Sequence, residues 1–279
     1  MPMHIAVLLT CHNRREKTVA CLEALFRAEV PEDVALDVYL IDDGSTDCTA
    51  DAVRSRFPHV HIHQGDGNLY WSGGMRAAWS QAIASGVQYE AFLWLNDDTF
   101  VYSDAVLCLI ESFEVSNRQA LLCATVVSST TGEPTYGGKD GVSPGCLRPT
   151  GGLTQCKITC GNCVLIPRVI FERIGMIDSC FTHAIGDFDY SLRVAKAGFK
   201  CFILPKAIGV CDSNPQKPRW CQPEIPFRER LANLYSPLGY AQPRPYFIYN
   251  TRHFGLYIAF KDLLSAHVRV FFPSLWKHR

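Results

Sequence analysis

The 279-residue sequence lacks three features that would assign it to familiar functional classes. It has no excess of charge of either sign, because 27 Lys and Arg balance 27 Asp and Glu, so nothing marks a nucleic-acid partner. No uninterrupted apolar run reaches the ~20 residues that a membrane span needs. The start lacks the basic region and long apolar core of a signal peptide, which predicts a cytoplasmic protein.

Cysteine, in contrast, is abundant, with thirteen residues. Their number is odd and their spacing irregular, apart from the close pair Cys160 and Cys163. Without export, we interpret them as buried thiols in a reducing compartment rather than as a disulfide scaffold. No second Cys/His pair follows Cys160-Gly-Asn-Cys163 at zinc-finger spacing, so core thiols are favoured and a metal site is the alternative.

Short apolar runs alternate with helix-like stretches through the first hundred residues. Residues 4–10, 36–41, 60–63 and 91–95 predict strands, whereas residues 17–27 and 73–84 predict helices. Uninterrupted apolar strands indicate a parallel sheet that is covered on both faces. We therefore predict an α/β fold in which a single domain has a mainly parallel central sheet flanked by helices.

Polar clusters follow three of these predicted strands, at residues 10–14, 42–47 and 96–99. In parallel sheets, ligands bind at the carboxyl ends of the strands. Asp42 and Asp43 provide more carboxylate than a turn requires, and they can accept hydrogen bonds from a base imide or from ribose hydroxyls. An ordinary strand-to-helix turn is the alternative, because Asp, Gly and Ser all suit turns.

The cluster Asn96-Asp97-Asp98-Thr99 follows five apolar residues, so its two carboxylates should be partly sheltered from water. Grouped charges in such a place are costly unless a cation or a donor compensates them. Mg²⁺ or Mn²⁺ would do so, held by one or two carboxylates and by substrate phosphate oxygens. A polar turn that caps the next helix is the alternative.

Five motifs in this order make the sequence resemble the family 2 glycosyltransferases, which have the A-type (GT-A) fold. The resemblance spans about residues 5–210, and it implies a catalytic domain over residues 1–212 with an extension over residues 213–279. Within that domain, the nucleotide-sugar half would end near residue 100 and the acceptor half would follow. The motifs are Thr10-Cys-His-Asn-Arg14, Leu40-Ile-Asp-Asp-Gly-Ser-Thr-Asp47, Gly67-Asn-Leu-Tyr-Trp-Ser-Gly-Gly-Met-Arg76, Leu95-Asn-Asp-Asp-Thr99 and Gly186-Asp-Phe-Asp-Tyr-Ser-Leu-Arg193.

The resemblance also implies roles for individual residues. Asp187 would be the general base, and Asp98 would hold Mg²⁺ or Mn²⁺, joined by Asp212 where relatives often carry a histidine. The acceptor would contact Asp189 and Trp71. The nucleotide sugar would contact Thr10, Arg14, Asp42, Asp43, Asn68, Arg76, Asn96 and Asp97.

The activity that the resemblance implies is inverting transfer of a sugar from a UDP- or dTDP-linked donor. The acceptor would be a hydroxyl of a glycan or lipid-linked molecule in bacterial surface polysaccharide assembly. Asn96 replaces the usual Asp, as in rhamnosyltransferase-like members, which favours a deoxysugar. Asn96 and Asp212 also support the alternative of a non-catalytic nucleotide-sugar sensor or partner subunit. A sugar-phosphate nucleotidyltransferase would need a glycine-rich loop where residues 10–14 contain no glycine.

The remainder of the chain is less regular. Residues 128–155 are rich in Gly, Ser, Thr and Pro, which predicts a long loop or small excursion, and a helix is predicted from Gly186-Asp187 to Gly198. Prolines follow Cys211, and residues 246–279 are apolar with interspersed Lys and Arg. Two hypotheses stay open for this last stretch. It is either a helix on the inner membrane surface near a lipid-linked acceptor, or a helix packed on the catalytic domain or in a homodimer contact.

Overall fold

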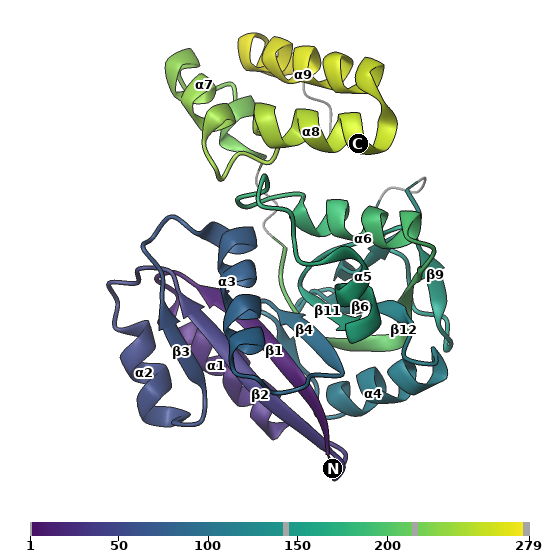
Figure 1. The fold of residues 1–279 in the computed structure, drawn as a ribbon. Helices are drawn as coiled ribbons and strands as arrows, with labels where there is room; N and C mark the ends of the chain where they lie inside the picture. The colour runs from purple at the N-terminus through teal and green to yellow at the C-terminus, as the bar shows by residue number, and fades with distance from the viewer. Residues whose placement is uncertain (1, 142–144, 214–216, 276–279) are drawn as a thin grey trace.

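The computed structural model describes residues 2–141, 145–213 and 217–275 (Figure 1). Its centre is a sheet in which the first strands of the chain lie side by side and parallel. Only β11 and β5 run against the common direction among the strands of the main path. The order across this path is β3 (His61–Gln64), β2 (Val34–Asp42), β1 (Met3–Cys11), β4 (Ala91–Leu95), β11 (Cys163–Pro167), β6 (Ala120–Val127), β12 (Lys200–Val210) and β5 (Phe100–Val101).

Helices cover both faces of this sheet. Successive side chains of a strand point to opposite faces, so each buried strand contributes to two apolar cores. In β1, Val7 and Leu9 pack into one apolar core, and Ala6 and Leu8 pack into the other. The first core is closed by α1 (Arg15–Arg27), α2 (Thr49–Arg56) and α4 (Ala105–Val115), and the second by α3 (Tyr70–Ala84), α5 (Arg168–Ile174) and α6 (Gly186–Lys196).

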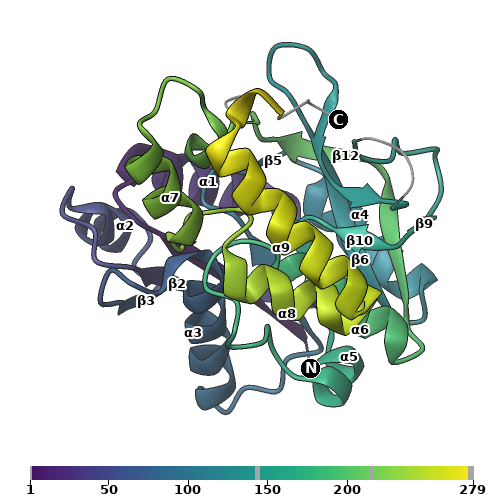
Figure 2. The same ribbon diagram turned by 90° about the horizontal axis from the view of Figure 1, so that it is seen from above.

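The last part of the described chain forms a helical layer over the carboxyl ends of the parallel strands (Figures 1 and 2). It has a small core of its own, which includes Trp220, Leu234 and Val270. Its helices are η1 (Arg219–Cys221), α7 (Phe227–Tyr235), α8 (Pro243–Phe254), α9 (Leu256–Phe271) and η2 (Pro273–Leu275). None of the helices within the described ranges combines the length and the apolar character that a membrane span requires.

The α/β class and the mainly parallel, helix-flanked sheet are confirmed. Some local predictions differ from the structure. The helices predicted to begin at residues 17 and 73 begin at Arg15 and Tyr70. Residues 128–155 are not only loop, because β7 (Pro134–Tyr136) and β8 (Gly138–Lys139) lie within them and β9 (Thr154–Cys156) begins there; β8 pairs with β10 (Ile158–Thr159). All thirteen cysteines are free thiols, and ten of them are buried.

Candidate active site

Two adjoining cavities open at the carboxyl edge of the sheet and share Trp71, Asn96 and His183 as a common wall. The first, of about 490 Å³, lies over β1, β2 and β4, and the second, of about 430 Å³, lies over β8, β11 and the start of α6. Besides the three shared residues, the first cavity is lined by Thr10, Cys11, His12, Arg14, Asp43, Gly67, Tyr70, Asp97, Asp98 and Leu238.

The turn after β2 is shaped by its two buried carboxylates. Asp43 accepts hydrogen bonds from the backbone N–H of Gly67 at 2.8 Å and of Tyr70 at 2.9 Å, and it thereby holds the loop that enters α3. Asp42 accepts from the Ser45 N–H at 3.0 Å. The Asp43 side chain still lines the first cavity, so its carboxylate remains within reach of a ligand there.

Glycine is required where α3 crosses the end of β1. A Cβ at Gly74 would lie 2.1 Å from the Thr10 hydroxyl oxygen, far inside contact distance. The absence of that side chain lets the helix approach the strand and leaves Thr10 in the wall of the first cavity. Gly74, in the second turn of α3, therefore has a packing reason, which supports the position of Thr10.

Arg14 lies between the two carboxylates that follow β4. Its guanidinium donates to Asp97 Oδ1 at 2.7 Å and to Asp98 Oδ2 at 2.7 Å. Burial raises the pKa of Asp97 to about 6, even though the charge of Arg14 opposes the rise. A cationic group thus already compensates the grouped charges, and Arg14 holds the place between them.

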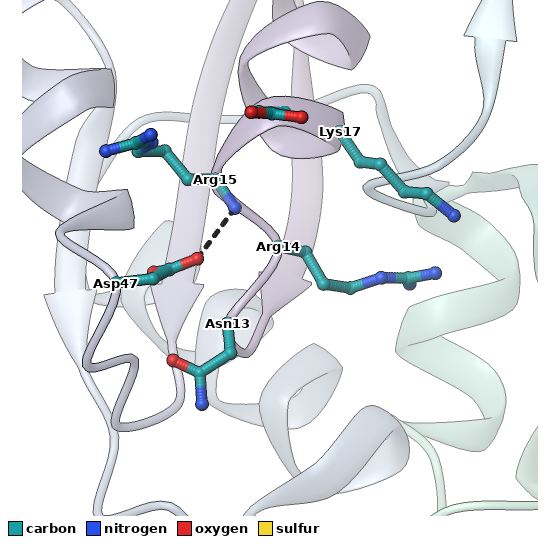
Figure 3. A pocket seen from close by; sticks show the side chains of 6 residues that line it. Asn13, Arg14, Arg15, Lys17 and Asp47 are labelled. Carbon is teal, nitrogen blue, oxygen red and sulfur yellow. Dashed lines mark hydrogen bonds between the residues drawn. The ribbon is translucent and has the colours of Figure 1, made fainter.

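A shallow pocket beside this pair is formed by the residues that lead into α1 (Figure 3). The backbone N–H of Arg15 donates to Asp47 at 3.0 Å, which ties the entry of α1 to the turn after β2. In Figure 3 the side chains of Arg14 and Lys17 extend in the same direction from this entry. The shallow pocket therefore contains three basic side chains, Arg14, Arg15 and Lys17, against Glu16 and Asp47.

The side-chain oxygen of Asn96 is already engaged in a hydrogen bond at the boundary between the two cavities. Its Oδ1 accepts a hydrogen bond of 2.7 Å from Trp71 Nε1, and the Trp71 ring meets Trp94 edge to face at 5.7 Å between ring centroids. An amide and an indole are thus locked together at the boundary of the two cavities. Trp71 lines both cavities from this position.

The second cavity contains one acidic side chain, Asp187, in the first turn of α6. Asp187 accepts hydrogen bonds from the backbone N–H of Gly161 at 2.8 Å and of Phe188 at 2.9 Å. Burial raises its pKa to about 6, and the hydrogen bond from Gly161 opposes that rise. A Cβ at Gly161 would lie 2.4 Å from the Trp71 ring, so only glycine allows this approach.

Asp189, two residues further along α6, faces away from the cavity and is fully buried. Its carboxylate accepts from Arg193 at 2.8 Å, from Arg252 at 2.7 Å and from His253 Nε2 at 2.8 Å. Burial alone would raise the pKa of Asp189, but the hydrogen bond from His253 and the two arginine charges lower it overall. Asp189 thus joins α6 to α8 of the C-terminal layer.

Asp42 lines neither cavity, and three other residues singled out from the sequence also lie outside both. Arg76 donates to the backbone carbonyls of Asp178 and Phe181 and braces that loop. Asn68 is exposed, and its N–H donates to Asp66 at 2.9 Å. Asp212 is held by the Ser129 N–H at 2.8 Å, with further bonds from the hydroxyls of Ser128 and Ser129. The structure brings none of the three to a cavity wall.

The structure also adds residues that sequence reasoning missed. His183 lines both cavities, and burial lowers its pKa, which keeps the imidazole neutral. Leu238 and Tyr240, from the segment between α7 and α8, close the first and the second cavity respectively. His183 stands four residues before Asp187, a local hint, whereas nothing in the proline-rich stretch indicated Leu238 or Tyr240.

Comparisons with known proteins identify the family and the fold. The family model described as Glycosyl transferase family 2 matches residues 6–175, whereas a search of curated protein sequences finds no match. Among solved structures, the mannosyltransferase PcManGT from Pyrobaculum calidifontis, in complex with GDP-Man and Mn²⁺, has a TM-score of 0.58 at 15% identity. The likeness covers 97% of this chain and 70% of that one.

TarS 1–349 from S. aureus is similar as well. Its complex with UDP has a TM-score of 0.59 at 13% identity, covering 90% of this chain and 72% of that one. Its complex with UDP-GlcNAc has a TM-score of 0.58 at 12% identity, covering 95% of this chain and 81% of that one. At such identities the likeness shows the fold, which is of the A type.

Proposed function

This chain belongs to glycosyl transferase family 2, and on that premise we propose that it is an inverting glycosyltransferase that uses a nucleoside diphosphate sugar. One observation carries the proposal: the first cavity, which is lined by Thr10, Arg14 and Asp43, shares a wall with the second cavity, which is lined by Asp187. A sugar held at that wall has a leaving group on one side and a base on the other. Such an arrangement suits a single in-line displacement.

The first cavity is the donor site in this proposal. Asp43 would accept a hydrogen bond from the imide N–H of a uracil or thymine, which favours a UDP- or dTDP-sugar, and Thr10 lies beside the same space. Arg14 would bind the diphosphate, because a guanidinium matches phosphate oxygens in a bidentate manner. PcManGT was solved with GDP-Man and TarS 1–349 with UDP-GlcNAc, so donors of this class occupy similar folds.

The side chains present fit a divalent ion of the Mg²⁺ or Mn²⁺ type. Among the described residues, Asp98 Oδ1 meets only the weak donor Cys211 Sγ, 3.7 Å away, whereas Asp98 Oδ2 and Asp97 Oδ1 accept from Arg14. No group of three His, Cys, Asp or Glu is gathered for a metal within the described residues, which suits an ion held by one or two carboxylates and substrate phosphates. When bound, the ion would offset the negative charge of the leaving diphosphate.

Asp187 is the general base in this proposal. With a pKa of about 6 it is mostly ionised at neutral pH, yet it is basic enough to accept a proton from an acceptor hydroxyl. Its two backbone hydrogen bonds fix the orientation of the carboxylate toward the cavity. The hydroxyl then attacks from the face opposite the diphosphate, and the anomeric configuration inverts.

Asp189 and the C-terminal layer hold this site together. Asp189 orients α6, and hence Asp187, through its ion pairs with Arg193 and Arg252, so we assign it a positioning role. The acceptor would enter under Tyr240, which lies close enough to Asp187 for that charge to raise the tyrosine pKa further, beyond the effect of burial. We assign residues 1–212 to catalysis and residues 213–279 to covering the acceptor site.

The finer specificity is part of the same proposal. The donor sugar would be a deoxysugar such as rhamnose, and the acceptor a glycan or lipid-linked molecule in the assembly of bacterial surface polysaccharide. Asn96, fixed by Trp71 rather than carrying a charge, is the observation that supports an uncommon donor.

A panel of UDP- and dTDP-sugars tests the function. Ligands that bind only the folded state raise the melting temperature, so the true donor should stabilise the protein, and more so with Mn²⁺. NMR of the glycoside product should then show the inverted anomer. Donor binding without transfer or hydrolysis under any condition would instead identify a nucleotide-sugar sensor, which the occupied place between Asp97 and Asp98 favours as the second candidate.

A further inference from the structure

Helix α9 is apolar on two opposite sides. One side, with Ala259, Ala266 and Val270, is buried against the rest of the C-terminal layer. The other side carries large apolar residues three or four positions apart, and these face outward from the molecule. Their exposed fractions are 79% for Tyr257, 61% for Phe260, 67% for Leu264, 37% for Val268 and 56% for Phe271.

This outward stripe is not part of a uniformly apolar surface. Among the described residues, 19 large apolar side chains are exposed, and 13 of them lie in residues 227–275. Helix α9 is also the outermost element of the molecule on this side (Figures 1 and 2). Contiguous exposed apolar surface of this kind marks an interaction site in a folded protein.

Charge is also distributed unevenly between the C-terminal layer and the rest of the described chain. Residues 217–275 contain eight Lys and Arg against three Asp and Glu, whereas residues 2–213 contain 17 against 24. The overall neutrality of the chain hides this separation. Lys261 lies in the outward stripe itself, four residues after Tyr257 and three before Leu264. Two copies of this basic layer would repel each other in a symmetric contact, whereas an anionic lipid surface would attract it.

From these observations we propose that α9 docks the protein on an anionic lipid bilayer. The helix lies in the plane of the interface, with Tyr257, Leu264 and Phe271 among the headgroups and upper acyl chains and with Lys261 at the phosphates. Leu238 and Tyr240 belong to the same layer and close the two cavities. If the proposed glycosyl transfer is correct, docking therefore brings the acceptor cavity next to the membrane, where a lipid-linked acceptor is embedded.

Co-sedimentation of the full chain with vesicles tests the proposal. Vesicles of phosphatidylcholine alone are compared with vesicles that also contain phosphatidylglycerol, at low and high salt. The wild type should bind the anionic vesicles, and less at high salt. Each interfacial apolar side chain contributes on the order of tenfold in partitioning, so Tyr257→Ser/Leu264→Ser should weaken binding by about 100-fold. Lys261→Glu should weaken binding to anionic vesicles only.

Ile83→Ser/Val115→Ser is the matched control, because these two exposed apolar residues lie on α3 and α4, away from α9. It should bind vesicles like the wild type. Asp187→Asn should bind vesicles as well, so a failure of the proposed catalysis is distinguishable from a failure of docking. The proposal is overturned if the wild type ignores anionic vesicles, or if Tyr257→Ser/Leu264→Ser binds them unchanged. If the wild type binds no vesicles, and ultracentrifugation shows a dimer that Tyr257→Ser/Leu264→Ser disrupts, α9 would be assigned to a contact with a second copy instead.

Discussion

Replacing Asp187 by Asn should lower the activity and at the same time stabilise the fold at neutral pH. The substitution keeps the shape of the side chain but removes its charge and its basicity. The half-buried carboxylate sits in a cavity where burial raises its pKa to about 6. An unfolded aspartate has a pKa of ~3.9, so the native state binds the proton more tightly. Stability therefore falls as the pH rises from about 4 to about 6, and the full cost is present above that window.

The magnitude follows from this difference. Two pKa units correspond to about 3 kcal/mol, and water that enters the cavity reduces this to about 2 kcal/mol. Against the gain stands one lost hydrogen bond. The amide oxygen of Asn can accept from Gly161 or from Phe188, but its NH₂ group cannot accept from the other. That loss costs about 1 kcal/mol, so the net gain at pH 7.5 is about 1 kcal/mol, or roughly 2–4 °C in melting temperature.

Thermal and urea unfolding of both proteins at pH 4.5 and pH 7.5 measure this difference. The variant should be the more stable protein at pH 7.5 and should lose that advantage at pH 4.5. Its kcat should fall by the ~10²–10⁴-fold typical of a lost general base, while donor affinity stays near the wild-type value. In the wild type, kcat/KM should fall about tenfold per pH unit below about 6. A variant that is less stable at both pH values, or that is fully active, would refute the reasoning.

Three further substitutions test other parts of the site. Asp189→Asn should destabilise the protein at pH 7 by about 3 kcal/mol, because it breaks a buried ion-pair network. The pKa of Asp189 is lowered in the fold, so the stability that its carboxylate contributes is present above about pH 4 and is lost on acidification. The urea midpoints of variant and wild type should therefore converge at low pH, and a constant difference between them would contradict this. Gly161→Ala forces a Cβ into the Trp71 ring, and kcat should fall with a loss of about 1–3 kcal/mol in stability, whereas unchanged kinetics would exclude the role given to this contact. Asp98→Ala should abolish the Mn²⁺ dependence of donor binding in calorimetry while the fold persists, and donor affinity equal to the wild type in Mn²⁺ would remove Asp98 from the metal site.

The sheet was largely predictable because its strands carry a strong local signal. The runs at residues 4–10, 36–41 and 91–95 are mainly apolar, with His4, Thr10 and Asp37 as the exceptions, and they correspond to β1, β2 and β4. Residues 105–127, in contrast, carry no clear local signal, although they contain α4 and β6. Residues 105–110 of α4 are apolar at every position, and so is β6 apart from Thr125, so neither run shows a periodicity that would separate a buried helix from a buried strand.

The candidate site was predictable where the chemistry sits at strand ends. Thr10, Asp43 and Asp98 line one cavity because parallel strands end at the same edge. Arg76 lines neither cavity, since its guanidinium is satisfied by two carbonyls of a loop about a hundred residues later. A motif position alone could not reveal that partner.

By itself, the sequence determined the fold class and the edge of the sheet at which the two cavities open, since both follow from the local periodicity that marks the strands and their ends. Only the tertiary structure decided what each charged group faces. Asp187 and Asp189 are two residues apart on one helix, yet one opens to a cavity and the other is buried on Arg252, 63 residues away. Arg14 finds Asp97 and Asp98 across 83 and 84 residues. Such partners are chosen by how the chain packs, and burial then sets the pKa and the role of each carboxylate.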